Sequence, residues 1–263
     1  MILETETKTM PFGIAVIGLD HWYTGFLVLD IVSASEKTPL IGVAERDESR
    51  RAEIGKRYPA AKVTEHADAL IARPEVALVA ITTSTDQAPE IAKRALAAGK
   101  HVLSVKPPAR TLAELDTVIA AAKRANRFYG SFEGMQRLNP AARIARDLIH
   151  SGAIGQPLSF YQQGHGGVPQ PWPGQNGPSW WTDRARVPGG AWIDHAIYAL
   201  DFARFVFAGE VESASGIIEN RVQKNLTVED YGASLMRLRP TGGGPSVSLI
   251  FEDTLMTSST AFR

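Results

Sequence analysis

The first half of the chain alternates short apolar runs with longer segments in which apolar residues recur at helical spacing. Apolar runs bounded by glycine or polar residues predict strands buried on both faces, and they cover residues 13–18, 40–44, 77–82, 101–104 and 127–132. The intervening spacing predicts helices from residue 22 to about residue 35 and over residues 48–57, 88–98 and 112–125. Strands that alternate with helices of this length indicate βαβ units and an α/β fold with a mostly parallel sheet.

The pattern changes after about residue 133. The spacing predicts helices over residues 140–151 and 191–207, an alternating strand over residues 158–163, and strands near residues 211–220, 232–238 and 246–251. Between the first of these strands and the second helix lies a long segment rich in Gly, Pro and Trp, over residues 164–190. Strands that follow one another in sequence favour antiparallel pairing, so this half predicts an α+β domain. We expect domains over residues 11–133 and 134–263, after a flexible tail over residues 1–10.

Composition narrows the classes of protein. The chain has 263 residues, of which 44% are hydrophobic and 21% charged, as in ordinary globular domains. It contains no cysteine, which excludes disulfides, iron–sulfur clusters and cysteine nucleophiles. Lys+Arg and Asp+Glu are equal at 28 each, so the bulk charge favours neither nucleic acid nor an anionic membrane as a partner. The polar, acidic N-terminus lacks the pattern of a signal peptide, and we expect a cytoplasmic protein.

The turn after the first predicted strand is a candidate nucleotide site. It reads G-L-D-H-W-Y from Gly18 onward, and a turn from strand to helix directs backbone N–H groups and a helix dipole at an anion. The full dinucleotide fingerprint is G-x-G-x-x-G, and Asp20 and Tyr23 stand where its second and third glycines belong. Taken alone, the turn is better explained as an ordinary βα connection. The Asp20 carboxylate would also weaken pyrophosphate binding unless it turned away or a cation intervened.

Two further positions favour the nucleotide hypothesis. Glu45 ends the second predicted strand, where a carboxylate can accept hydrogen bonds from a ribose and repel a 2′-phosphate; its alternative role is an acid at a helix N-terminus. Arg46 would instead accommodate that phosphate, so NAD is favoured over NADP without excluding it. Thr82, Thr83 and Ser84 follow the next strand, as ligand contacts or as helix caps. The residues that we expect to bind NAD or NADP are Gly18, Leu19, Asp20, His21, Trp22, Glu45, Arg46, Thr82, Thr83 and Gln87.

Four segments, in order, resemble the glucose–fructose oxidoreductase/inositol dehydrogenase (Gfo/Idh/MocA) family. They are S-V-K-P-P-A from residue 104, Q-R-L-N-P-A from residue 136, G-G-A-W-I-D-H-A-I-Y-A-L-D from residue 189 and V-E-D-Y-G from residue 228. The resemblance implies a Rossmann domain with a doubly wound parallel sheet and an α+β domain with an open-faced, mostly antiparallel sheet. It also implies an NAD(P)-dependent oxidoreductase that acts on a hydroxyl of a sugar or cyclitol.

The resemblance implies catalytic residues as well. It places Lys106, followed by Pro107, beside the nicotinamide with Asp194 nearby, and it aligns Tyr198 with the family's proton-transferring histidine. Asp194 and Tyr198 are four residues apart and share a helix face. Packing in a helix–sheet interface is an equal alternative for Tyr198, and surface solvation is the alternative for Lys106. His195 is either a substitute acid/base or a structural hydrogen-bond partner, and we expect no metal site.

The long loop is a candidate substrate site. Its tryptophans, with nearby arginines, suit the stacking and hydrogen bonding of a sugar ring. An equal alternative is that they pin the loop to its own domain or to a neighbouring subunit. The candidate substrate-binding residues are Arg137, His165 and Trp181.

The last residues, 252–263, are mostly polar and indicate an incomplete tail of a shortened second domain. A shortened sheet leaves an edge or an apolar face exposed, so we expect a homo-oligomer, a dimer or a tetramer. Two alternatives to a polyol dehydrogenase stay open. One is NAD-assisted glycoside cleavage, and the other is a nucleotide-binding or regulatory protein that has lost catalysis.

Overall fold

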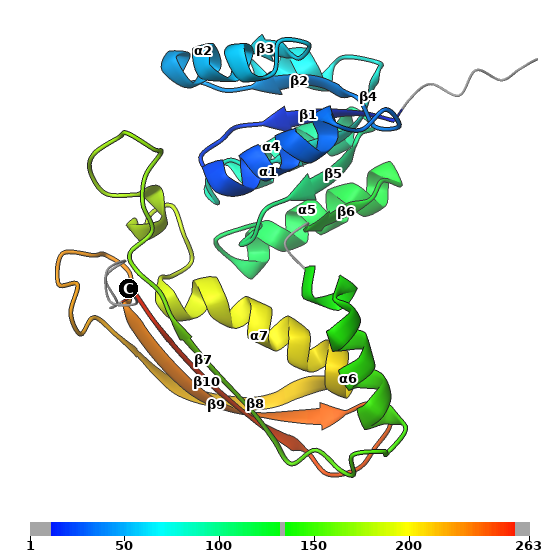
Figure 1. The fold of residues 1–263 in the computed structure, drawn as a ribbon, viewed down its shortest axis with the longest axis vertical. Helices are drawn as coiled ribbons and strands as arrows, with labels where there is room; N and C mark the ends of the chain where they lie inside the picture. The colour runs from blue at the N-terminus through cyan, green and yellow to red at the C-terminus, as the bar shows by residue number, and fades with distance from the viewer. Residues whose placement is uncertain (1–11, 132–134, 256–263) are drawn as a thin grey trace, which may run out of the picture. The chain divides into compact units, whose positions relative to one another are not determined.

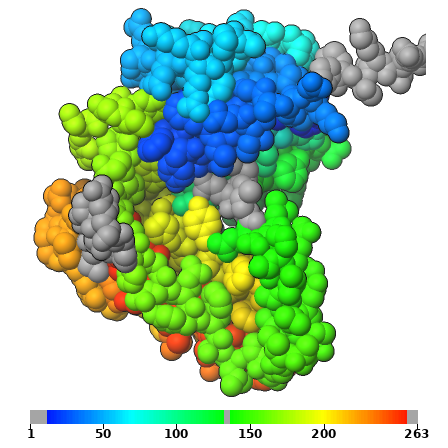
Figure 2. Space-filling model, viewed as in Figure 1, coloured from blue at the N-terminus to red at the C-terminus, as the bar shows by residue number. Residues whose placement is uncertain are grey.

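A computed structural model of the protein describes residues 12–131 and 135–255 and divides the chain into two compact units, Met1–Ser131 and Phe132–Arg263 (Figure 1). Figure 2 gives the space-filling view of the same atoms. The expected N-terminal tail and the end of the strand predicted to reach residue 132 lie outside the described residues. Within the described ranges, no helix has the length and apolar character needed to cross a bilayer.

The first unit is built on a six-stranded parallel sheet with the order β3-β2-β1-β4-β5-β6. This order confirms the doubly wound Rossmann sheet, in which the strand order reverses beside β1. The strands are β1 (Gly13–Ile17), β2 (Leu40–Ala44), β3 (Lys62–Thr64), β4 (Val76–Ile81), β5 (His101–Ser104) and β6 (Tyr129–Ser131).

The helices of this unit lie against the sheet (Figure 1). They are α1 (Trp22–Ser33), α2 (Glu48–Arg57), α3 (Ala67–Ile71), α4 (Ala88–Ala97) and α5 (Leu112–Ala125). The helix α2 begins where the Asp47 side chain accepts from the backbone N–H of Arg50, 2.9 Å away. The sequence pattern did not predict β3 and α3, because three and five residues are too few to establish a period.

The second unit carries a four-stranded sheet with the order β7-β10-β9-β8. Its elements are the 3₁₀ helices η1 (Met135–Leu138) and η2 (Trp180–Thr182), the helices α6 (Pro140–His150) and α7 (Ala191–Phe207), and the strands β7 (Ser159–His165), β8 (Gly209–Glu219), β9 (Tyr231–Pro240) and β10 (Val247–Thr254). Two of the three strand pairs are antiparallel, which confirms a mostly antiparallel sheet, whereas β7 pairs with β10 in parallel.

The end of β10 corrects the expectation of a polar tail from residue 252 onward. Glu252, Asp253 and Thr254 continue the strand and pair with both β9 and β7, and Asp253 and Thr254 are buried. The same pairing extends β7 to His165, two residues further than predicted. Polar residues are tolerated here because cross-strand pairing and side-chain partners satisfy them.

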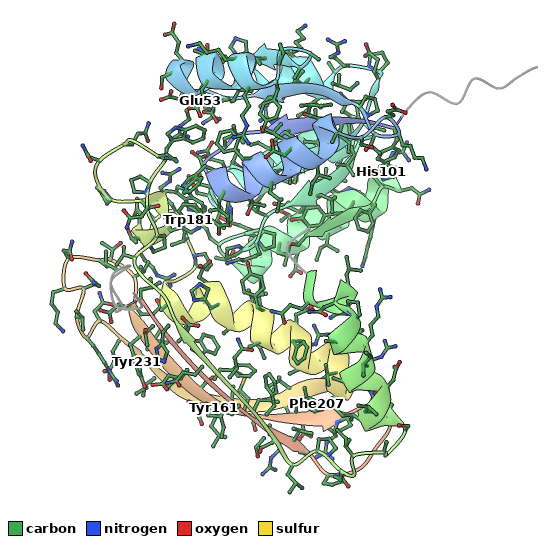
Figure 3. All side chains as sticks on the ribbon, viewed as in Figure 1. Glu53, His101, Tyr161, Trp181, Phe207 and Tyr231 are labelled. Carbon is green, nitrogen blue, oxygen red and sulfur yellow. The ribbon has the colours of Figure 1, made fainter. Side chains whose placement is uncertain are left out.

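The two faces of this sheet differ. The face covered by α7 holds the core, in which small residues of the helix lie over large apolar residues of the sheet: Ala196, Ala199, Ala203, Met236, Leu238, Leu249 and Phe251. On the other face, Tyr161, Ile250 and Leu235 form one row across β7, β10 and β9 and are 57%, 39% and 54% exposed. Figure 3 labels Tyr161 on this open face.

Candidate functional site

The turn between β1 and α1 requires the glycine that the sequence pattern singled out. Gly18 has a φ of +74°, and a Cβ atom built on it would lie 2.2 Å from Cγ2 of Thr83. The Thr82 hydroxyl donates to the Gly18 carbonyl, and the Gly18 N–H donates to Ala44 O at 2.7 Å. The backbone therefore passes directly against the β4–α4 turn, and a side chain at position 18 would separate the two.

Gly25, in the helix that follows the turn, does not fit the spacing of G-x-G-x-x-G and was missed by that comparison. A Cβ atom on Gly25, in α1, would lie 2.4 Å from the Leu19 side chain and 3.2 Å from Oγ1 of Thr82. Gly25 thus allows close packing of helix and strand, which is the role of the third glycine in the usual fingerprint. It lies two residues beyond Tyr23, and a glycine early in a predicted helix was the signal that could have found it.

Glu45 links two turns. Its carboxylate accepts from the backbone N–H groups of Leu19 at 2.8 Å and Asp47 at 2.9 Å. The side chain is buried, and this burial raises the pKa of the Glu45 carboxyl. Asp47, not Glu45, caps α2, so the alternative of a helix N-terminal acid is wrong for Glu45. The neighbouring Arg46 is exposed.

The Asp20 carboxylate points toward the β4–α4 turn. One oxygen accepts from the backbone N–H of Ser84 at 3.0 Å, and the other lies 3.5 Å from a guanidinium nitrogen of Arg50. The second of the two conditions under which a carboxylate is compatible with this turn is therefore present, because a cation lies beside Asp20.

The hydroxyls after β4 are not helix caps, contrary to the alternative considered for them. The helix α4 begins at Ala88 with Gln87 as its N-cap residue, three residues beyond Ser84. Thr83 is 4% exposed, and its hydroxyl has no hydrogen-bond partner among the described residues. A buried polar atom without a partner, beside a cavity, is a candidate ligand contact.

A cavity of about 230 Å³ lies among these turns, at the carboxyl end of the parallel strands. It is lined by Ile17, Gly18, Asp20, Ala44, Glu45, Arg46, Glu65, His66, Ala67, Asp68, Thr83, Gln87, Ile91 and Arg94. Six of the residues expected to bind the cofactor therefore line one cavity, at the place where open α/β sheets bind ligands.

Three other expected cofactor residues contribute differently. Leu19 and His21 are fully buried, and their backbone N–H groups donate to Glu45 and to Thr82 O. Trp22 begins α1 and is half-buried, with its ring 5.7 Å from that of Tyr23. These residues build the turn rather than line its cavity.

Lys106 follows β5 and is 4% exposed, so the alternative of a solvated surface lysine is wrong. Its neighbour Val105 is also buried and donates its N–H to Ile81 O at 3.1 Å, which extends the pairing of β5 with β4. The peptide bond between Lys106 and Pro107 is cis. An ammonium group buried after a strand is unusual, because desolvation disfavours its charge.

The helix α7 carries Asp194, His195 and Tyr198. His195 Nδ1 lies 2.7 Å from a carboxylate oxygen of Asp253 in β10, and its Nε2 lies 3.5 Å from a carboxylate oxygen of Asp194. The imidazole thus lies between two carboxylates, one from its own helix and one from β10. Tyr198 is half-buried one turn further along the helix.

Asp253 is a site residue that the sequence pattern missed, because its segment was interpreted as a tail. It is buried, and Gly164 makes room for it, since a Cβ atom there would lie 2.1 Å from an Asp253 oxygen. Its strand neighbours in the register are Gly164 on β7 and Gly232 on β9. No sequence signal pointed to Asp253, because the two glycines that flank it are its neighbours only in the folded sheet.

The structure does not bring together the three residues that were expected to bind substrate, Arg137, His165 and Trp181. Trp181 is 6% exposed and stacks on Trp180 with ring centroids 4.3 Å apart, as in a loop pinned by its tryptophans. Arg137 makes a two-pronged ion pair with Asp201 of α7, with one contact of 2.8 Å. His165 ends β7 and alternates onto the open face of the sheet, away from α7.

Two family models match the chain. One, described as the oxidoreductase family with an NAD-binding Rossmann fold, covers residues 12–132, and the other, the GFO/IDH/MocA C-terminal domain, covers residues 142–243. Levoglucosan dehydrogenase of Pseudarthrobacter phenanthrenivorans is 30% identical over 217 residues, which are 82% of this chain and 54% of the relative. Myo-inositol 2-dehydrogenase of Thermotoga maritima is 26% identical over 200 residues, which are 76% of this chain and 56% of the relative.

The chain therefore spans about half the length of these curated relatives. Among solved structures, GenD2 from gentamicin A biosynthesis, in complex with NAD, superimposes with a TM-score of 0.81 at 20% identity over 98% of this chain and 70% of that one. This likeness confirms the fold.

Proposed function

The chain belongs to the GFO/IDH/MocA family of oxidoreductases, and from that premise we propose that it is an NAD(P)-dependent oxidoreductase acting on a polyhydroxylated ring. Its reaction moves a hydride between the nicotinamide and a hydroxyl-bearing carbon of a sugar, cyclitol or related polyol. The observation that supports this most strongly is the cavity at the β1–α1 turn, lined by Gly18, Glu45 and Thr83.

The first unit supplies the residues for the cofactor. The cavity offers a close backbone approach at Gly18, a carboxylate at Glu45 and a buried hydroxyl without a described partner at Thr83. These groups fit a ribose and a pyrophosphate, with Arg46 and Gln87 also on the cavity wall. When bound, the nicotinamide supplies the hydride acceptor or donor.

Glu45 favours NAD over NADP. A carboxylate at the end of the second strand accepts hydrogen bonds from ribose hydroxyls and repels a 2′-phosphate. Two backbone donors already fix its orientation, so it is preorganised for this role. Arg46 beside it is exposed and can pair with a 2′-phosphate, so we expect NADP to bind more weakly than NAD rather than not at all.

We assign the chemistry to Lys106, Pro107, Asp194, Tyr198 and His195. An alcohol gives up its proton as it loses hydride, so the reaction needs a proton acceptor and a cation that stabilises the oxygen. Lys106 supplies the cation, with Pro107 fixing the chain after it, and Tyr198 exchanges the proton. Asp194 binds a substrate hydroxyl, and His195, held by Asp253, orients Asp194.

The substrate class follows from the relatives and from the polar groups of the second unit. The two relatives are named for levoglucosan and myo-inositol, which are polyhydroxylated rings. We extend this class to the present chain; Arg137, His165 and Trp181 stay predictions from the sequence, because the structure does not bring them together.

A second copy of the chain is the proposed partner. The row Tyr161, Ile250 and Leu235 exposes apolar side chains across three strands, and such patches mark interaction surfaces. The expected state is a dimer or tetramer. Light scattering at micromolar concentration checks this, and a monomer would contradict it.

The direct test of the activity is a screen of sugars and cyclitols with NAD⁺ or NADP⁺, followed by the absorbance of reduced nicotinamide. We expect reduction with at least one polyol, and its loss in Lys106→Met while NAD⁺ binding persists. Glycoside cleavage without net production of NADH would identify the second candidate reaction. Failure to bind either dinucleotide would leave only a regulatory role.

A further inference from the structure

Three turns of the first unit are joined by a small network of charges. Glu45, after β2, accepts from Leu19 of the β1–α1 turn and from Asp47 of its own turn. Asp20 of the β1–α1 turn accepts from the backbone of Ser84, after β4. These turns surround the cavity in which the proposed function places the dinucleotide.

The network has one cation at its centre. A guanidinium nitrogen of Arg50 lies 3.5 Å from Asp20 and 4.0 Å from Glu45. The side chain of Arg50 is 13% exposed and that of Asp20 is 25% exposed, so solvent screens this ion pair less than a surface pair. The backbone of Arg50 is also held in place, because its N–H donates to the side chain of Asp47, the N-cap residue of α2, at 2.9 Å.

Asp20 stands at the position of the fingerprint's second glycine, where the usual chain has no side chain at all. Its carboxylate lines the cavity, so an uncompensated charge there would oppose a phosphate group. The same carboxylate holds the turn in place through Ser84. Removing the Asp20 carboxylate would therefore release the turn, which weakens phosphate binding, and would also remove a repulsive charge, which strengthens it. The positive charge of Arg50 decides which effect dominates.

We propose that Asp20 and Arg50 act as one charge-compensated pair that replaces the second glycine of the dinucleotide turn. Asp20 positions the turn through the Ser84 N–H, and Arg50 neutralises the charge that would otherwise repel the pyrophosphate. Both are positioning residues, and the inference rests on the proposed binding of NAD(P). It makes Arg50, a helix residue outside the fingerprint, a determinant of cofactor affinity.

Calorimetric titration of NAD⁺ into the full chain tests the pair. Arg50→Gln removes the positive charge beside Asp20 and should weaken binding by about tenfold or more. Asp20→Asn keeps an acceptor for Ser84 and should bind within about threefold of wild type, or more tightly. The double variant D20N/R50Q should recover to within about threefold of wild type, whereas Asp20→Ala, which loses the acceptor, should bind about tenfold more weakly.

The matched control is Arg57→Gln in the same helix. Arg57 pairs with Asp30 of α1 at 2.8 Å, and neither residue lines the cavity. Its affinity for NAD⁺ should be that of wild type. Should Arg50→Gln fail to fold, as judged by circular dichroism, Arg50→Lys keeps the charge and should bind within about threefold of wild type.

Three results would overturn the inference while leaving the proposed function intact. The first is wild-type affinity in R50Q, and the second is a double variant as weak as R50Q. The third is a tenfold loss in Arg50→Lys, because charge would then not be what matters. Failure of the wild-type chain to bind NAD⁺ or NADP⁺ would instead overturn the proposed function and, with it, this inference.

Discussion

Replacing Glu45 by alanine should destabilise the first unit measurably, because two backbone donors lose their acceptor. Leu19 is fully buried, so its N–H cannot bond to water in the variant. A buried donor left unpaired lowers the free energy of unfolding by about 1–3 kcal/mol. The Asp47 N–H is half-buried, so water replaces part of its bond, at a loss of about 0.5–1 kcal/mol.

One effect opposes these losses. Burial raises the pKa of Glu45 above its ordinary value of 4.5, so the ionised form carries an unfavourable desolvation free energy near neutral pH. The net loss in the free energy of unfolding should be about 2 kcal/mol, which lowers the melting temperature by about 4–8 °C for a chain of this length. Glu45→Gln keeps one acceptor and should lose about half as much.

The pH dependence has a definite sign. A carboxyl whose pKa is higher in the folded state binds its proton more tightly when folded, so wild-type stability rises relative to the alanine variant as pH falls through the raised pKa of Glu45. Urea unfolding followed by circular dichroism, at neutral pH and at mildly acidic pH, measures both quantities. The control is Glu48→Ala, on the exposed first turn of α2. Equal stability of the Glu45→Ala and Glu48→Ala proteins would refute the reasoning.

Three further predictions concern space and burial. Gly18→Ala forces a methyl group into the β4–α4 turn at a positive φ, so it should lower both the melting temperature and the affinity for NAD⁺. The control is Gly55→Ala in α2, whose methyl group meets open space and should stabilise the chain by up to about 1 kcal/mol in a thermal melt. Gly164→Ala displaces the Asp253 carboxylate and should lower the free energy of unfolding by about 1–3 kcal/mol in urea; no change would show that the carboxylate has room. Burial raises the pKa of Tyr129 from its ordinary value of 10 to about 12, so stability should fall as pH rises through this range, and Tyr129→Phe should make that fall shallower in melts.

The long elements of the fold could be predicted from sequence because their signals are local. The helix α2 follows residues 48–57 as expected, since Asp47 caps it and charged residues cover its exposed face. The short elements β3 and α3 could not be predicted, because their existence depends on pairing with β2 and packing within the unit.

The residues of the candidate site also fall into those that the sequence predicted and those that it did not. Gly18 and Glu45 follow from motif and position, and both line the cavity. Gly25 and Asp253 could not be predicted in this way. The role of Gly25 depends on its close packing against Leu19, and Asp253 belongs to a strand whose polar sequence resembles a tail. Contacts between residues far apart in sequence decide both cases.

The decisive experiment for the proposed cofactor site is equilibrium binding of NAD⁺ and NADP⁺ to the wild-type chain, measured by calorimetry. We predict saturable binding of one NAD⁺ per chain and weaker binding of NADP⁺, because Glu45 lines the cavity at the end of β2. Absence of binding heat for both dinucleotides, in a protein shown to be folded, would contradict it.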